Sequence, residues 1–299
     1  MPKTAEPRQP VARERYVEVD GTALFVREIG DGHPIVVLHG GPDFDHTYLV
    51  PELDRLAASA RLIYYDQRGR GRSAAVAAEG VGIESELTDL AALTREVATD
   101  PVALLGHSWG GVLAMEYAAR YPERVSHLIL MDTGPASASE WARFREYLRA
   151  LRAPGEVEEM AQLAATARYA AGDVQAELDY YRIHFRSTVP AEHLEELLRR
   201  LRAHFTEDTV LAARAIEQRL YAQTCLRPEY DLVPALSALP IPTLVLCGEH
   251  DFIPIEMAAR IADAMPGARL GVIDGCGHFP YLERPDMVHE LVAGLINAG

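Results

Sequence analysis

Short apolar runs that alternate with helix-like segments constrain the fold of this 299-residue chain more than any other feature. Each run is entered from polar residues and ends in Gly, Asp or His, which is typical of strands buried on both faces of a parallel sheet. The runs lie within residues 34–41, 61–69, 101–108, 124–132, 242–251 and 268–278. Helix-like segments lie at 47–58, 83–98, 109–120, 255–265 and 285–298. A hairpin pattern around Asp20-Gly21 precedes them. The chain is therefore predicted to form a doubly wound α/β sheet.

The alternation stops after Asp132 and returns near Leu244. Residues 134–232 between them contain charged, amphipathic helix patterns and no good strand. A helical insertion of this kind often covers a functional site, so we expect a helical cap over 134–232. The remaining chain divides into a flexible tail at 1–15 and a core formed by 16–133 and 233–299.

Composition narrows the function classes. The 44 acidic and 29 basic residues give a formal net charge of −15. A negatively charged protein is repelled by phosphates, so the charge argues against a nucleic-acid-binding function. Three cysteines without a CxxC pair suit a reducing compartment. The first residues lack the apolar stretch of a secretory signal, and no apolar run approaches the length of a membrane span. We expect a cytoplasmic protein with no membrane partner.

One motif carries a nucleophile. Gly106-His107-Ser108-Trp109-Gly110 fits the pattern G-x-S-x-G, which occurs by chance in many chains. Here an expected strand precedes it and an expected helix follows it, which is the arrangement of a nucleophile elbow. The small residues allow the sharp turn that exposes the hydroxyl of Ser108. The competing interpretation is a glycine-rich turn with an idle serine.

A serine hydroxyl needs a base, and the base needs an orienting acid. In the elbow architecture these follow in chain order at the ends of later strands. The run ending at Gly248 leads to Asp251, and the final run leads to His278 in a glycine-flanked loop. We therefore predict Asp251 as the acid and His278 as the base. Glu249 is the competing acid.

The oxyanion of an acyl-transfer reaction needs two backbone N–H donors. One is expected from the residue after the nucleophile, Trp109, and the other from the loop that follows the first buried run. Gly41 in His39-Gly40-Gly41-Pro42 occupies that loop, and a glycine lets the backbone approach a substrate closely.

The chain resembles the α/β-hydrolase superfamily over about residues 16–298, and within it the proline iminopeptidases (prolyl aminopeptidases). That family carries an HGGPG loop, a DQRG-x-GRS segment, a GxSWGG elbow and a GCGH turn. This sequence has HGGPD at 39–43, DQRGRGRS at 66–73, GHSWGG at 106–111 and GCGH at 275–278. The resemblance implies an α/β-hydrolase fold: a mostly parallel eight-stranded sheet flanked by helices, with a helical cap inserted after strand 6.

The substrate pocket departs from the family pattern. Asp43 replaces the last glycine of HGGPG. Such peptidases recognise the free α-amine of the substrate through acidic residues, in some members a Glu directly after the triad acid, where this chain has Phe252. Glu217, Glu140 and Asp43 are the other acids available, but none sits on a matching motif, and the ordinary interpretation of each is a solvated helix or loop charge. Trp141 is a candidate for an apolar pocket wall.

The predicted function is a serine hydrolase that acts through an acyl-enzyme on a small-molecule or short-peptide substrate. The resemblance favours an aminopeptidase that cleaves an N-terminal residue, and a carboxylesterase on small esters is the alternative. A ligand-binding protein with an intact triad but no turnover is a third possibility. The sequence implies no cofactor and no metal, and it leaves the oligomeric state open.

Overall fold

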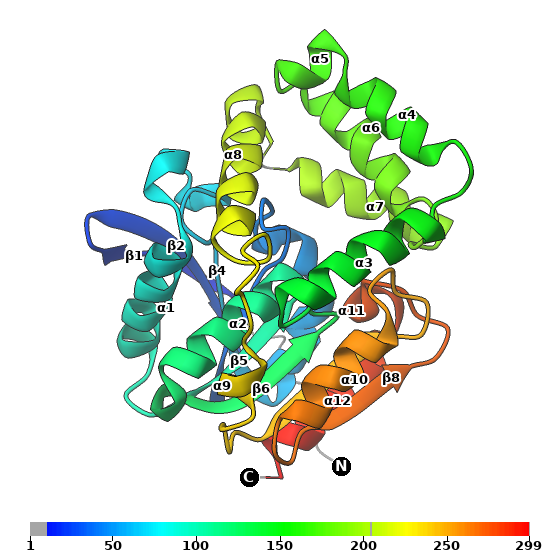
Figure 1. Cartoon of the computed structure of the whole chain (residues 1–299). Helices are drawn as coiled ribbons and strands as arrows, with labels where there is room; N and C mark the ends of the chain where they lie inside the picture. The colour runs from blue at the N-terminus through cyan, green and yellow to red at the C-terminus, as the bar shows by residue number, and fades with distance from the viewer. Residues whose placement is uncertain (1–10, 204, 299) are drawn as a thin grey trace, which may run out of the picture.

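The computed structural model describes residues 11–203 and 205–298, which form one eight-stranded sheet with helices on both faces (Figure 1). The strand order is β1-β2-β4-β3-β5-β6-β7-β8. The strands are β1 Arg13–Val19, β2 Thr22–Ile29, β3 His33–Leu38, β4 Ala60–Tyr65, β5 Val102–His107, β6 Val125–Met131, β7 Thr243–Gly248 and β8 Arg269–Ile273. Only β2 runs antiparallel to its neighbours, so the mixed, mostly parallel sheet that we predicted is confirmed.

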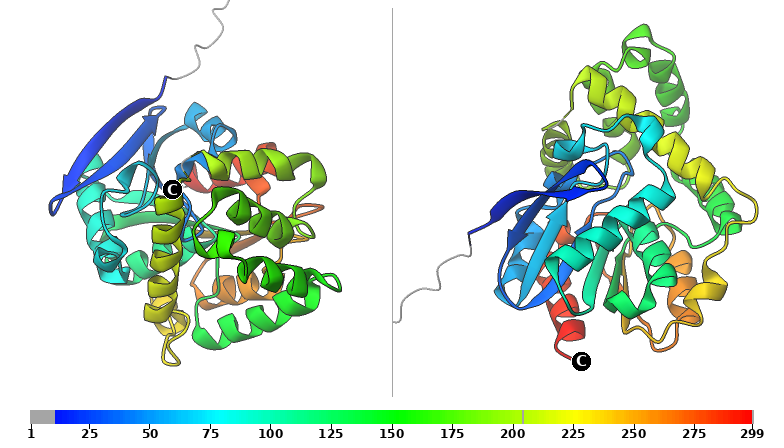
Figure 2. Two further views of the ribbon diagram at one scale, coloured as in Figure 1. Left: turned by 90° about the horizontal axis from the view of Figure 1, so that it is seen from above. Right: turned by 90° about the vertical axis from the view of Figure 1, so that its left-hand side faces the viewer.

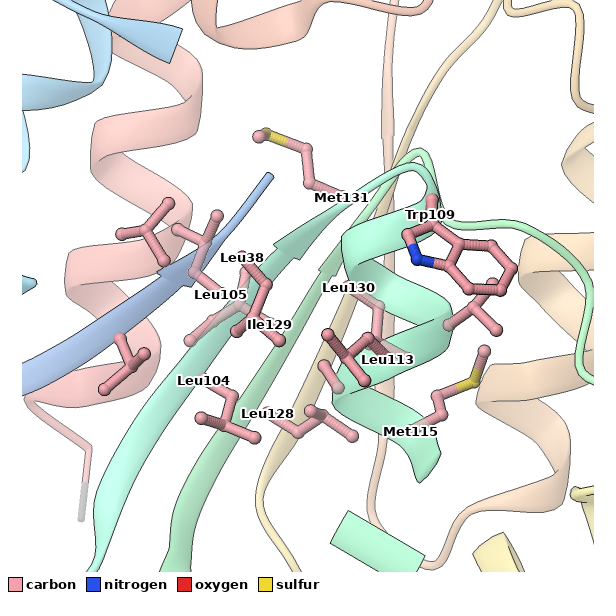
Figure 3. Close-up of a cluster of buried hydrophobic side chains, with 14 of the residues drawn as sticks. Leu38, Leu104, Leu105, Trp109, Leu113, Met115, Leu128, Ile129, Leu130 and Met131 are labelled. Atoms are coloured by element: carbon pink, nitrogen blue, oxygen red, sulfur yellow. The ribbon is translucent and has the colours of Figure 1, made fainter. Parts of the chain in front are cut away.

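The central strands are buried because their residues are apolar on both faces. Helix α2 (Trp109–Arg120) returns along β5 and packs its apolar side on the sheet. Figure 3 shows Leu113 of α2 beside Leu128 and Leu130 of β6. Each such fully buried side chain contributes about 1.5–3 kcal/mol, which holds the start of α2 at the carboxyl ends of the strands.

Two groups of helices cover the two faces of the sheet. Helices α1 (Ile83–Val97), α2, α9 (Val233–Leu236) and α10 (Ile255–Ala264) contact one another in series. The opposite group consists of the 3-10 helix η2 (Glu52–Ala58), α11 (Pro280–Glu283) and α12 (Pro285–Ile296), which also contact one another. These layers leave the carboxyl ends of the parallel strands open to the insertion.

Helices α3 to α8 lie between β6 and β7 in the chain and gather beyond the carboxyl ends of the strands (Figures 1 and 2). They are α3 Ala138–Leu151, α4 Glu156–Ala164, α5 Ala167–Ala170, α6 Val174–Phe185, α7 Ala191–Arg202 and α8 Glu207–Gln223. An isolated bridge between Ser137 and Asp231 joins the two ends of the insertion. In the part of the chain that the structure describes, no helix has the length and apolar character to cross a membrane.

Two local predictions within the first 58 residues differ from the structure. The helix expected at 47–58 is two 3-10 helices, η1 (His46–Leu49) and η2, because Pro51 lacks the N–H that a continuous helix needs. The tail expected to end at residue 15 gives way to β1 already at Arg13, which pairs in register with Glu28 of β2. Residues 1–10 of that predicted tail lie outside the described residues.

The last predicted buried strand, β8, is the edge of the sheet rather than an interior strand. Arg269, Leu270 and Val272 are exposed because β8 pairs with β7 on one side and, among the described residues, no further strand pairs with its other side. The chain pattern does not reveal which apolar run has a neighbour on only one side.

Candidate active site

The nucleophile elbow is formed at the junction of β5 and α2. Ser108 has φ 56° and ψ −117°, an unusual conformation for a residue with a side chain. A Cβ added at Gly106 would lie 2.3 Å from the carbonyl oxygen of Gly110, and one at Gly110 would lie 2.1 Å from that of Leu38. Both glycines are therefore required where α2 passes close to β3 and β5.

Asp251 and His278 meet although 26 residues separate them in the chain. Nδ1 of His278 lies 2.8 Å from Oδ1 of Asp251, and both side chains are buried. The backbone N–H of Ile253 donates to the same Asp251 oxygen at 3.1 Å. Ser108 and His278 line one pocket, so the structure brings the three predicted triad residues together.

The competing acid, Glu249, points elsewhere. Oε2 of Glu249 accepts the backbone N–H of Gly275 at 2.9 Å, and its side chain is exposed. Asp274 is also exposed. The geometry therefore favours Asp251 as the partner of His278.

The loop after β3 lies against the elbow. Gly41 has φ 116°, and a Cβ there would lie 2.2 Å from the backbone nitrogen of Asp43. Gly41, Ser108 and Trp109 all line the pocket. The two residues predicted to supply the oxyanion donors thus line the same cavity as the serine.

A buried hydrogen-bond chain ties the three loops of the site together. The hydroxyl of Tyr48 accepts the N–H of Gly40 at 2.7 Å and lies 2.7 Å from Nδ1 of His107. Nε2 of His107 donates to the carbonyl of His278 at 2.8 Å, which leaves Nδ1 as the acceptor for Tyr48. Burial lowers the pKa of His107 well below its ordinary value, consistent with a neutral, structural ring.

The pocket is a cavity of about 330 Å³ between the strand ends and the insertion, a size suited to a small molecule. All four predicted pocket residues, Asp43, Trp141, Glu217 and Phe252, line it. The ring of Phe252 lies 4.1 Å from that of His278, centroid to centroid. Trp141 stacks at an angle on Tyr221, which in turn contacts Trp109.

Two carboxyl groups are held in this largely aromatic pocket. Burial, together with the charge of Glu177, raises the pKa of Asp43 to about 6, although the hydroxyl of Tyr181 donates to its Oδ2. Burial and the charge of Asp43 raise the pKa of Glu217 to about 8, although Tyr221 also hydrogen-bonds to it. Both shifts mean that the pocket disfavours two negative charges without a cation.

A third pocket acid, Glu177, forms an ion pair within the protein. The guanidinium of Arg214 on α8 binds its Oε2, with Nε at 3.0 Å. Glu140, the other acid that the sequence offered, binds Arg260 at 2.8 Å and does not line the cavity. Of the four acids, Asp43 and Glu217 line the pocket and form no ion pair with any of the described residues.

Sequence reasoning missed the tyrosines that hold these acids. Tyr181 and Tyr221 lie on α6 and α8, where the helical pattern gives no sign that they face the elbow. Tyr221 lies four residues after the acid that it contacts, Glu217, which places the two on one helix face, whereas Tyr181 contacts Asp43 from a distant part of the chain. The spacing of Tyr221 was the only available signal.

Among the described residues, two groups bring three potential metal ligands within 4.8 Å of one another. One is Asp45, His46 and Asp66, where Nδ1 of His46 lies 2.6 Å from Asp66. The other is Asp132, Asp251 and His278. In both groups the histidine is satisfied by a carboxylate, so hydrogen bonding accounts for the arrangement.

The fold and the site together define a class of protein. The chain belongs to the alpha/beta hydrolase fold family, whose model matches residues 33–285. Within that class it is similar to the proline iminopeptidase of Clostridioides difficile (strain 630), with 28% identity over 294 residues, 95% of this chain and 98% of the relative.

Solved structures of the class agree on the fold. The proline iminopeptidase of Mycobacterium smegmatis superposes with a TM-score of 0.72 and 25% identity, covering 96% of this chain and 98% of that one. A thermophilic esterase from Thermogutta terrifontis gives a TM-score of 0.65 and 25% identity, covering 97% and 98%. The chain is thus a hydrolase of this family, with peptidases and esterases among its relatives.

Proposed function

We propose that the protein is a serine hydrolase that works through an acyl-enzyme, and that it is an aminopeptidase similar to the proline iminopeptidases. Its substrates would carry a free N-terminal amine, and the scissile amide would follow the first residue. The observation that carries this proposal is the pair of carboxyl groups, Asp43 and Glu217, in the pocket that Ser108 faces.

The chemistry follows from the positions of the triad. Ser108 attacks the carbonyl carbon while Nε2 of His278 takes its proton, and Asp251 holds Nδ1 of the ring. The N–H groups of Gly41 and Trp109 donate to the oxyanion. His278 then protonates the leaving amine, and water releases the acyl group by the same route.

The charge of the pocket supports a cationic substrate. A substrate ammonium between Asp43 and Glu217 would offset the burial and the nearby negative charges that raise the pKa values of both. A neutral ester would give these two pocket acids no positively charged partner. Carboxylates in the pocket wall therefore favour a peptidase, whereas an all-apolar wall would favour an esterase.

A carboxylesterase on small esters remains the second candidate. The aromatic lining favours it, since Trp141, Phe144 and Phe252 could accept an apolar acyl or alcohol group. The similarity to an esterase structure points the same way.

One comparison of substrates tests the proposal. Purified protein is assayed with a proline arylamide, with its N-blocked derivative and with a short p-nitrophenyl ester, and Ser108→Ala is the control for background hydrolysis. We expect turnover of the arylamide and a large loss on blocking its amine. Turnover of the ester alone would establish the esterase. If Ser108 failed to react with a fluorophosphonate, the third alternative, a ligand-binding protein, would stand.

A further inference from the structure

A second aspartate lies beside the proposed triad. Asp132 follows the last residue of β6, and its backbone has φ 46°, in the left-handed region that a residue with a side chain seldom adopts. Its side chain is buried, with 1% of the residue exposed. A strained, buried aspartate needs a structural or chemical reason to be tolerated.

The backbone around Asp132 joins the loops of the site. Its N–H donates to the carbonyl of Leu246 at 2.8 Å, and its Oδ1 accepts the N–H of Gly248 at 2.9 Å. The neighbouring carbonyl of Met131 accepts the N–H of Ser108 at 3.0 Å. Asp132 therefore sits between the nucleophile elbow and the turn that carries Asp251.

The free oxygens of the two aspartates complement each other. Oδ2 of Asp132 and Oδ2 of Asp251 are both buried, and none of the described residues donates a hydrogen bond to either. An oxygen of each carboxyl and a ring nitrogen of His278 lie within 4.8 Å of one another. A single proton placed between the two carboxyl groups would satisfy both unpartnered oxygens.

The surroundings decide which aspartate holds that proton. Asp251 already accepts two N–H groups, those of His278 and Ile253, on its Oδ1. Asp132 accepts one backbone N–H, and burial together with the charge of Asp251 raises its pKa well above the ordinary value. The other groups in its electrostatic reach are acidic or neutral: Glu283, Cys247, Cys276 and Tyr281.

We propose that Asp132 is a neutral carboxylic acid that donates its O–H to Oδ2 of Asp251 and so positions the carboxylate that orients His278. It does not reach the substrate and is a positioning residue. This role rests on the proposed serine-hydrolase function, whereas the protonation of Asp132 does not.

Infrared spectroscopy tests the protonation without any substrate. The difference spectrum of wild type minus Asp132→Asn at neutral pH should contain the carbonyl stretch of a protonated carboxyl. A carboxylate band in its place would overturn the proposal. Circular dichroism of both proteins verifies that the variant is folded.

Activity tests the positioning role. Asp132→Asn keeps a donor toward Asp251 and an acceptor for Gly248, so its rate of fluorophosphonate labelling at Ser108 should stay within about threefold of wild type. Asp132→Val, of similar shape, offers neither, and the rate should fall about 10–100-fold. Equal losses in two folded variants would refute the role.

The alkaline pH profile adds a readout that a purely structural residue would not move. As pH rises through the raised pKa of Asp132, wild type loses the proton and the labelling rate should fall, whereas Asp132→Asn should show no such decline. If wild-type Ser108 is unreactive throughout, the hydrolase proposal fails, and the infrared result still decides the state of Asp132.

Discussion

Replacing Glu217 with Gln removes one of the two carboxylates proposed to bind the substrate amine and preserves the size of the side chain. Glu217 lies on α8 in the pocket wall. A hydrogen bond between charged groups contributes about 1.5–3 kcal/mol, and about 1.4 kcal/mol corresponds to a tenfold change in affinity. We expect kcat/KM for a proline arylamide to fall about 10–150-fold, mainly through KM.

The same substitution should stabilise the fold at alkaline pH. Glu217 has a pKa of about 8 in the folded protein against an ordinary 4.5, so the folded chain holds this proton more tightly than the unfolded chain. Its contribution to stability is full below pH 4.5 and is lost as pH rises through about 8. Because water reaches the pocket, we expect Glu217→Gln to gain about 2 kcal/mol at pH 9 and nothing at pH 4.5.

Two assays check this pair of effects. Steady-state kinetics compares the arylamide with a short p-nitrophenyl ester, whose rate should change less than about twofold because it has no amine. Urea unfolding at pH 5 and pH 9 measures stability. Glu207→Gln, the same change at the exposed first residue of α8, is the matched control. Equal losses on amide and ester, or an unchanged arylamide KM, would refute the amine-binding role.

Three further substitutions test the framework of the site. Gly106→Ala places a Cβ 2.3 Å from the carbonyl oxygen of Gly110 and should abolish fluorophosphonate labelling, while retained labelling would contradict the tight elbow. Tyr48→Phe removes the hydroxyl that links the oxyanion loop to the elbow and should cost about 1–3 kcal/mol in urea unfolding, so an unchanged midpoint would argue against the link. Arg70→Leu strips the buried Glu86 of its partner and should cost about 3–5 kcal/mol at pH 8. That loss should shrink toward pH 5, since burial already raises the pKa of Glu86 and favours its protonation, and a pH-independent loss would contradict this account.

Local patterns predicted the strands and the order of the proposed triad well. The elbow around Ser108 is encoded by glycines within two residues, and the loop of His278 by glycines beside it. Pro51 is a local signal for the break in the helix expected at 47–58. The apolar spacing of that segment nevertheless fits one helix, so the spacing alone predicts the wrong element.

The apolar pattern of a strand does not predict its position within the sheet. Arg269–Ile273 has the same kind of apolar pattern as the central strands, but it forms the edge, since burial depends on which strand lies beside it. The strand order places β3 and β5 next to each other across 63 intervening residues, and no local pattern records that pairing.

The α/β class, the elbow, and the candidates Asp251 and His278 could be inferred from the sequence, because each depends on residues close together in the chain. The pocket that Glu217 shares with Asp43, and the contact of Asp132 with Asp251, depend on how distant segments fold together. Charge, burial and protonation depend on neighbours in space, and the packing of the insertion on the strand ends supplies those neighbours.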